Sequence, residues 1–243
     1  MSAIATLTIG QSNGIRRARP DAVAYIRTLL AKVTDTMLLQ IVGELSKPSK
    51  MPGFAYGIPA EECRTGSMLR GVKNSACSKC YALKGSYVWP ATRAAYARRF
   101  QAIRNGSLWV AAMSLLLERQ AAKGNPHFRW HDSGDIQDAN HLHNICMVHD
   151  FATASIGWIP TREYRTLDGF DRTLPDNLTV RVSAHMIAER APSRFATSSM
   201  IIRKGESAPE GVAHCPAPQQ GGECRDCRNC WDRTVATVAY TQH

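Results

Sequence analysis

The segment HFRWHDSGDIQDANHLHNICMVHDFATASIGWIPTR, residues 127–162, decides the fold. Its apolar runs predict strands at residues 127–131 and 154–159, and the longer periodic stretch between them predicts a helix at residues 138–151. A strand, a helix and a second strand in this order form a unit with parallel strands and a right-handed connection. The segment therefore predicts an α/β fold.

The same alternation continues towards the C-terminus. We expect a short helix at residues 161–167, strands at residues 178–183 and 198–203, and a helix or turn at residues 185–195. Successive parallel strands joined by helices favour a full or partial parallel β/α barrel of the TIM type. In such a barrel the functional side chains lie at the carboxyl ends of the strands.

The flanking parts of the chain suggest two domains. Before the deciding segment we expect helices at residues 21–33, 90–104 and 107–123, a strand at residues 37–42 and a long loop at residues 43–89. After it, residues 205–222 are rich in Pro, Gly, Gln and Ala and have the composition of a linker. We therefore expect a catalytic barrel domain at residues 1–204 and a small cysteine-rich, metal-binding extension at residues 205–243.

Seven of the eight cysteines fall into two groups, with the spacings C-x13-C-x2-C and C-P-x7-C-x2-C-x2-C. The groups are Cys63, Cys77 and Cys80, and Cys215, Cys224, Cys227 and Cys230. Such thiols bind a metal ion or an iron–sulfur cluster, or they form disulfides, and the redox compartment decides which. The N-terminus lacks a signal-peptide pattern, and no apolar run approaches the length of a membrane span. We therefore expect a cytoplasmic protein with reduced, metal-binding thiols.

The two cysteine groups differ in what they can bind. The four C-terminal thiolates suit either a 4Fe–4S cluster or a tetrahedral zinc ion. The three N-terminal thiolates leave one cluster iron, or one position on a metal ion, free for a substrate or cofactor. Alternatively, a histidine brought close by the fold completes a Cys3His zinc site. The candidates for that ligand are His131, His141, His143 and His185.

The net charge of +10 comes largely from one segment. Between Cys63 and Arg104 there are nine basic residues, counting Arg104 itself, and no acidic residue. Aromatic residues such as Tyr87 and Trp89 are interleaved with them. Because basic side chains contact phosphates and aromatic rings stack on unpaired bases, we expect a nucleic acid or nucleotide partner, with a solvated helix face as the alternative. The candidate contacts are Lys84, Arg93, Arg98 and Arg99.

Polar residues follow three of the predicted strands. Because the carboxyl ends of barrel strands carry the catalytic groups, we assign candidate catalytic roles to Asp132, Asp135 and Arg162. Aspartates in such loops also serve as turn caps. The candidate cofactor-binding residues are Ser133, Gly134 and Ser183.

Other polar residues and one cysteine receive less specific expectations. Cys146 shares the apolar stripe of its helix and is expected in the core. We expect surface or capping positions for the histidines of the helix at residues 138–151. For three arginines near the strand ends we expect either anion binding or a surface ion pair. These residues are His141, His143, His149, Arg162, Arg165 and Arg181.

The element Cys77-x2-Cys80-Tyr81-Ala82 resembles the cluster loop of radical S-adenosylmethionine enzymes. In that family a three-cysteine 4Fe–4S cluster follows the first barrel strand, and its fourth iron chelates the methionine part of S-adenosylmethionine. The turn at residues 133–135 resembles the glycine-rich turn that receives the amino group of that cofactor, and the C-terminal cysteines resemble auxiliary cluster modules. The usual spacing is x3 then x2, and Lys79 stands where that family has an aromatic residue. The resemblance implies an iron–sulfur enzyme that modifies a nucleic acid base or a nucleotide.

Two further resemblances accompany the first. The order Cys-Tyr-Ala, Ser-Gly-Asp, Thr-Arg and clustered cysteines, over residues 63–231, is similar to a poorly characterised phage protein family. Residues 132–137 and 160–162 are similar to the Asp-Ser-Gly-Gly-Phe-Gln and Pro-Thr-Arg motifs of tRNA-guanine transglycosylases. That likeness implies a zinc-dependent enzyme that exchanges guanine for a 7-deazaguanine in DNA or RNA, with Asp132 or Asp135 as base or nucleophile. A third interpretation is a non-enzymatic nucleic-acid-binding protein stapled by two structural metal sites.

Overall fold

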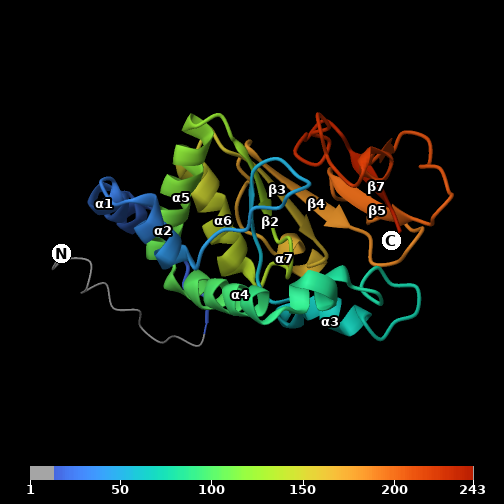
Figure 1. Ribbon diagram of the computed structural model, residues 1–243, viewed down its shortest axis with the longest axis horizontal. Coiled ribbons are helices and arrows are strands. Elements are labelled where there is room, and N and C mark those ends of the chain that lie inside the picture. Colours follow the sequence, from blue (N-terminus) through green and yellow to red (C-terminus); the bar gives the residue numbers. More distant parts are fainter. Residues whose placement is uncertain (1–13, 243) are drawn as a thin grey trace.

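The computed structural model describes residues 14–242, and a parallel sheet forms its centre (Figure 1). Seven strands lie in the order β1-β2-β3-β4-β5-β7-β6, and every neighbouring pair is parallel. The strands are β1 (Phe54–Tyr56), β2 (His127–Trp130), β3 (Ile156–Thr161), β4 (Leu178–Ser183), β5 (Ser198–Ile202), β6 (Ala213–His214) and β7 (Thr237–Thr241).

The strand order identifies the type of α/β fold. Strands β1 to β5 follow the order of the chain, as in a β/α barrel, whereas a doubly wound sheet reverses its order near the middle. The predicted α/β fold with parallel strands is confirmed. Among the described residues the hydrogen-bonded series runs from β1 at one edge to β6 at the other, which corresponds to the partial form of the predicted barrel.

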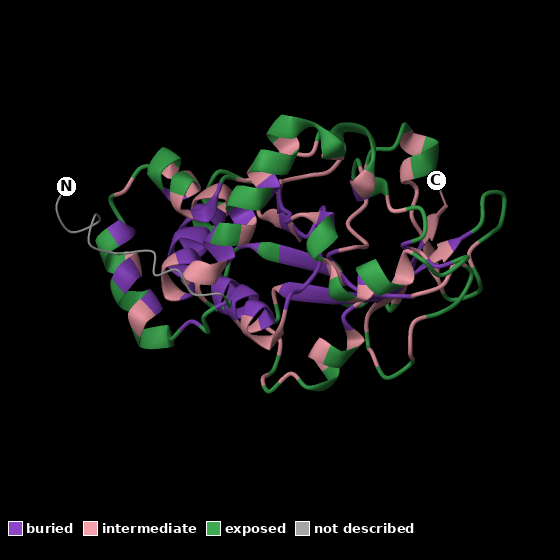
Figure 2. Ribbon diagram, turned by 90° about the horizontal axis from the view of Figure 1, so that it is seen from below, coloured by how far each residue is buried: buried purple, intermediate pink, exposed green. Residues whose placement is uncertain are grey.

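Helices cover one side of this sheet (Figure 1). α5 packs against α1, α2 and α6, and these helices form one core with the buried residues of β1 to β4 (Figure 2). Met200, Ile202 and Ala239 of β5 and β7 belong to a second, smaller cluster. The α-helices are α1 (Pro20–Leu30), α2 (Asp35–Val42), α3 (Arg64–Leu69), α4 (Pro90–Ala102), α5 (Ser107–Ala122), α6 (Ala139–Phe151) and α7 (Tyr164–Asp168). The 3-10 helices are η1 (Ala60–Glu62), η2 (Tyr81–Leu83), η3 (Gly85–Val88), η4 (Ile103–Asn105) and η5 (Ala217–Gln220).

The predicted strand at residues 37–42 is wrong, because these residues belong to α2. The Thr34 hydroxyl caps the helix by accepting a hydrogen bond from Met37 N, and Gly43 ends it with a φ of 77°. Leu38 and Val42, one helical turn apart, are its buried residues. A short apolar run is ambiguous between strand and helix, and here the caps at its two ends decide the outcome.

One other predicted segment differs from the structure. The expected loop at residues 43–89 contains the first strand, β1, as well as α3. Residues 185–195 form turns, which agrees with the second of the two expected alternatives, a helix or a turn.

The C-terminal segment belongs to the same sheet as the rest of the chain. β7 pairs with β5 over five residues, and β6 pairs with β7. Trp231 is buried and donates a hydrogen bond from Nε1 to Phe128 O in β2. The division at residue 204 into two domains stays a prediction, but the extension is packed onto the barrel strands.

Arg181 of β4 fixes this C-terminal segment in place. Its side chain is fully buried, which contradicts both the predicted surface ion pair and an anion-binding role. The guanidinium donates hydrogen bonds to backbone carbonyl oxygens, and a charged donor satisfies such acceptors strongly. The acceptors are Asn229 O, Cys230 O, Asp232 O, Val235 O and Ser198 O, at 2.6–3.3 Å.

The buried side of α6 is more polar than the sequence suggests. Cys146 lies in the core as predicted. The expected surface positions of His141 and His149 are wrong, since both side chains are almost completely buried. His149 accepts a hydrogen bond at Nε2 from Trp130 Nε1, at 2.9 Å, and the pairing of two polar groups explains why a histidine is tolerated there.

No helix in residues 14–242 has both the length and the apolar character needed to cross a membrane.

Candidate metal centre at the carboxyl edge of the sheet

The first cysteine group lies beyond the carboxyl end of β1, in the loop that contains α3. A Cβ atom added to the buried Gly66 would lie 2.9 Å from Cys63 Cβ and 3.6 Å from the sulfur atoms of both Cys63 and Cys77. The two thiols therefore share the space that a side chain at residue 66 would fill. All eight cysteines of the chain are free thiols.

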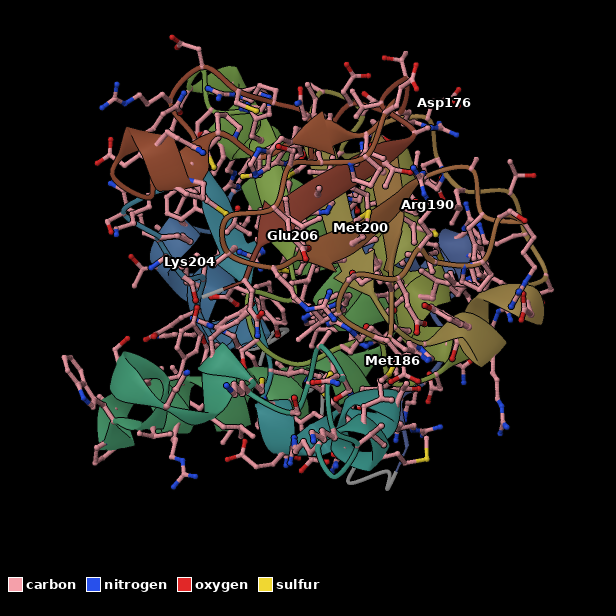
Figure 3. The ribbon with its side chains drawn as sticks, turned by 90° about the vertical axis from the view of Figure 1, so that its right-hand side faces the viewer. Asp176, Met186, Arg190, Met200, Lys204 and Glu206 are labelled. Carbon is pink, nitrogen blue, oxygen red and sulfur yellow. The ribbon has the colours of Figure 1, made fainter. Side chains whose placement is uncertain are left out.

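Side chains from the next strand loops hold this cysteine loop. Glu163, just after β3, is buried and accepts hydrogen bonds from Thr65 N at 2.9 Å and Thr65 Oγ1 at 2.7 Å. Ser75 forms an antiparallel bridge with Met186, in the loop after β4, and Ala76 N donates to His185 O at 2.8 Å. Figure 3 shows Met186 on the side of its loop that faces the α3 segment. The loops after β1, β3 and β4 thus meet at one edge.

Burial disfavours the thiolate form of two cysteines of this group, Cys63 and Cys77, by raising their pKa. Burial raises the pKa of the Cys63 thiol far above its usual range, and the nearby Asp135, Cys80 and Cys77 raise it further. Burial also raises the pKa of Cys77, while the cations Arg162 and Arg70 oppose that rise. Asp135 and Arg70 are therefore charged neighbours of both thiols, and Arg162 is a further charged neighbour of Cys77.

Asp135 connects the ends of β2 and β3. Its two carboxylate oxygens accept hydrogen bonds from Ile136 N at 2.8 Å and from Arg162 N at 2.9 Å. Burial raises the pKa of Asp135 to about 6, although hydrogen bonds from Thr161 and from these amides oppose the rise. Both oxygens serve the backbone, which is the turn-capping alternative considered for this residue.

Asp132 differs from Asp135 because one of its oxygens is free. Its Oδ2 accepts a hydrogen bond from Tyr96 OH at 3.3 Å, whereas the buried Oδ1 has no hydrogen-bond partner. A Cβ atom on Gly57 would lie 2.0 Å from Oδ1, so only glycine leaves room for this carboxylate. An unpaired buried acceptor is costly, and Asp132 is therefore a better candidate for ligand contact than Asp135.

A small cavity adjoins the cysteine loop and the turn after β2. Its volume is about 180 Å³. Ser133 lines it, and the buried Ser133 Oγ has no hydrogen-bond partner. The other lining residues are Pro59, Ala60, Glu61, Ala82, Tyr87, Arg93 and Tyr96.

The other two candidate cofactor-binding residues have structural partners. Gly134 has a φ of +81°, and a Cβ atom there would lie 2.3 Å from Ile58 Cγ1, so glycine is required by both conformation and packing. Ser183 is buried and accepts a hydrogen bond from Ser199 Oγ at 3.0 Å. Arg162, the third candidate catalytic residue, donates weakly from Nε to Ala184 O at 3.4 Å.

The structure separates the candidate nucleic-acid contacts. Arg99 lies on the buried side of α4 and donates hydrogen bonds to Glu44 O and Ser46 Oγ. Its assignment to a binding surface is therefore wrong. Arg93 and Arg98 are exposed but form ion pairs with Glu61 and Glu44 at 2.9 Å.

Exposed basic residues without an acidic partner lie closer to the cysteines. Lys84 is one of them, as predicted. Sequence reasoning did not select the other three, although their position in the acid-free segment was a usable signal. Within residues 63–89 the exposed basic side chains without an ion pair, which we call the basic loop, are Arg64, Lys73, Lys79 and Lys84.

The second cysteine group occupies the connection between β6 and β7. Cys215 N donates to Ala239 O in β7, and Cys224 N donates to Lys50 O, both at 2.9 Å. Cys230 Sγ lies 3.1 Å from Tyr240 OH. Burial raises the pKa of Cys230 to about 11, and that of Cys215 and Cys224 also rises through burial.

A larger cavity lies beside this second group. It has a volume of about 410 Å³ and is lined by Cys215. In the part of the chain that the structure describes, no three His, Cys, Asp or Glu side chains stand close enough to hold one metal ion as placed. The remaining lining residues are Lys50, Ala217, Pro218, Gly221, Gly222, Tyr240 and Thr241.

Comparison with known proteins identifies a family. The model of the family described as Gene product 88 matches residues 28–233, a range that contains both cysteine groups and the Ser-Gly-Asp turn. No curated protein and no solved structure matches the chain. The order of motifs had predicted a phage family, and the chain belongs to the Gene product 88 family of phage proteins.

Proposed function

We propose that this protein is an iron–sulfur enzyme that modifies a nucleic acid base or a nucleotide. The observation that carries the proposal is the convergence of Cys63 and Cys77 with Asp135 and Arg162, from the loops after β1, β2 and β3, at the carboxyl edge of a parallel sheet. Functional groups of β/α barrels lie at this edge.

The residues fit a cluster better than a single metal ion. Because Gly66 has no side chain, the sulfur atoms of Cys63 and Cys77 both border the space beside its Cα. A 4Fe–4S cluster binds each cysteine through a different iron, and its ligands therefore stand farther apart than those of one ion. Arg70 and Arg162 supply positive charge beside thiols that become thiolates on binding.

In this proposal Cys63, Cys77 and Cys80 would hold the cluster, which would supply an open coordination position for S-adenosylmethionine. The chain's own residues supply the surroundings. Asp132, with its unpaired Oδ1, and Ser133, with its unpaired Oγ, offer polar contacts beside the adjoining cavity. The second group, closed by four cysteines, carries a cluster or a zinc ion with no open position.

The basic loop supports an anionic substrate. Its four cations surround the first cysteine group in the chain and have no acidic partner among residues 14–242, so they are available to phosphates. In the transglycosylase alternative, the first cysteine group has no role, and both oxygens of Asp135 are engaged by backbone amides. The cluster enzyme therefore accounts for more of the site.

Anaerobic purification with iron, sulfide and zinc analysis tests the proposal. We expect the wild type to bind one 4Fe–4S cluster at the first group. The combined Cys63→Ser, Cys77→Ser and Cys80→Ser variant should lose four irons, whereas Cys146→Ala, which alters a core cysteine, should lose none. Added S-adenosylmethionine should change the electron paramagnetic resonance spectrum of the reduced wild type. Zinc without iron at the first group would overturn the proposal.

A further inference from the structure

Arg129 of β2 lies between the two cysteine groups. Its register partners in the sheet are Ala55 and Trp158, and its guanidinium carbon lies 4.8 Å from the centre of the Trp158 ring. The neighbouring residues Phe128 and Trp130 point into the helix-covered core. Because side chains alternate along a strand, Arg129 points to the opposite face of the sheet, where Trp231 and the C-terminal segment pack.

The side chain contacts direct neighbours of both groups. Arg129 Nη2 donates to Tyr81 OH at 3.1 Å, and Tyr81 follows Cys80 in the chain. Nη1 lies 3.6 Å from Met51 Sδ, beside Lys50, whose carbonyl oxygen accepts from Cys224 N.

Aromatic packing extends this connection to the second group. Trp158, which stacks against Arg129, packs edge-on against Trp231 at 5.4 Å, and Trp231 follows Cys230. One arginine therefore reaches the residue next to Cys80 and the surroundings of Cys224 and Cys230.

Arg129 has no acidic partner within ion-pair distance, although the carboxylate of Asp132 attracts its charge from farther away. It forms no ion pair with any residue in 14–242, and its Nε is buried without a hydrogen-bond partner. Arg129 is half-buried, and a cation withdrawn from water without an ion-pair partner is costly. Burial raises the pKa of Cys224 and Cys230, and the charge of Arg129 opposes that rise at both.

We propose that Arg129 is the half-buried counter-charge that couples the two cysteine groups when their thiols become thiolates. This inference rests on the proposed function, because it requires a metal centre at each group. Four thiolates around a divalent metal ion carry a net charge of about −2, which the positive charge of Arg129 offsets in part. Through Tyr81 the same cation orders the segment beside Cys80. Arg129 is thus a positioning residue for both centres.

Cobalt(II) binding to the second group alone tests the proposal without the first centre. The background is the Cys63→Ser, Cys77→Ser and Cys80→Ser variant, and the thiolate-to-cobalt absorption reports binding. In this background Arg129→Met should weaken cobalt affinity by about tenfold, the loss typical of an outer-shell partner, and Arg129→Lys should restore most of it. The matched control is Arg233→Met, which removes an exposed arginine of the same segment that pairs with Asp176.

The full chain supplies the second readout. With a cluster in the first group, Arg129→Met should make the cluster's reduction potential more negative, because the loss of a nearby positive charge disfavours an added electron. Tyr81→Phe alters an exposed ring and should shift cobalt affinity and potential in the same directions by smaller amounts.

The outcomes separate this inference from the proposed function. Folded Arg129→Met with unchanged cobalt affinity, an equal loss in Arg233→Met, or no cobalt binding at the second group would overturn the inference. If neither Arg129 variant folds, unchanged affinity in Tyr81→Phe overturns it. Failure of the proposed function shows separately, as absence of iron at the first group in the wild type.

Discussion

The two cysteine groups are held in different ways. The first lies in a loop after β1 and is fastened by side chains and backbone from neighbouring loops, chiefly Glu163 and the Ser75–Met186 bridge. The second lies between two strands of the sheet, and a single buried arginine, Arg181, fastens its backbone. The first group is therefore sensitive to the packing of the loops around it, whereas the part of the second group near Cys230 depends on one interior cation.

Replacing Arg181 should disrupt the fold and metal binding of the second cysteine group and leave metal binding at the first group largely unchanged. Arg181→Met leaves several buried carbonyl oxygens without a donor, and each unsatisfied group costs about 1–3 kcal/mol. We expect the free energy of unfolding, measured by chemical denaturation of the metal-free protein, to fall by at least about 3 kcal/mol. Metal at Cys215 to Cys230 should be lost before iron at the first group.

Arg172→Met is the control for that experiment. Arg172 pairs with Asp150 at the surface, where an ion pair contributes at most about 1 kcal/mol. Equal losses of stability in the two variants would show that Arg181 has no special role in holding the C-terminal segment.

A methyl group at residue 66 should weaken cluster binding at the first cysteine group and leave metal binding at the second group unchanged. In Gly66→Ala the added carbon would lie 2.9 Å from Cys63 Cβ, and forced overpacking costs about 1–3 kcal/mol. That strain corresponds to roughly ten- to hundredfold weaker cluster binding, measured by iron retention against a chelator. Gly71→Ala is the matched control, since a Cβ at Gly71 has no neighbour within 4 Å. Equal iron retention in the two variants would contradict the shared-space geometry.

Much of this comparison could be predicted from the sequence. The β2-α6-β3 unit has long, periodic segments, and the cysteine spacing separates a three-residue group from a four-residue group without any structure. The position of the polar turn after β2 followed from the rule that barrel chemistry lies at strand ends. These features are local in the chain.

The remaining features depend on contacts between distant residues. β1 is only three residues long, too short to show a period of two, and it lay hidden in an expected loop. Arg99 and Arg181 look like surface cations in the sequence, but both bind backbone carbonyl oxygens in the interior. Nothing near Glu163 in the sequence indicates that it caps a helix almost 100 residues earlier.

Acid should lower the free energy of unfolding of the protein, because two histidines of α6 are buried in its core. Burial lowers the pKa of His141 and His149 in α6 to about 3, whereas an unfolded histidine has a pKa of about 6.5. Below pH 6.5 the unfolded chain therefore binds protons that the folded chain does not. Stability should fall from about pH 6.5 down to about pH 3, by about 1.4 kcal/mol per pH unit for each histidine.

Chemical denaturation of the metal-free protein across this pH range measures that slope. His149→Gln keeps an acceptor for Trp130 Nε1 but cannot take up a proton, so its slope should be smaller by the contribution of one histidine. An unchanged slope in this variant would mean that acid acts elsewhere in the molecule.

The smallest expected effect distinguishes the basic loop from the paired arginines. Lys79→Ala removes an exposed cation without an acidic partner in the described chain, and it should lower the salt dependence of nucleic-acid binding by about one unit of slope. Arg98→Ala removes a cation that already pairs with Glu44, so the slope should change less. Fluorescence anisotropy with a single-stranded oligonucleotide at several salt concentrations measures both. A larger change of the salt-dependence slope in Arg98→Ala would indicate that the binding surface lies along α4 and away from the first cysteine group.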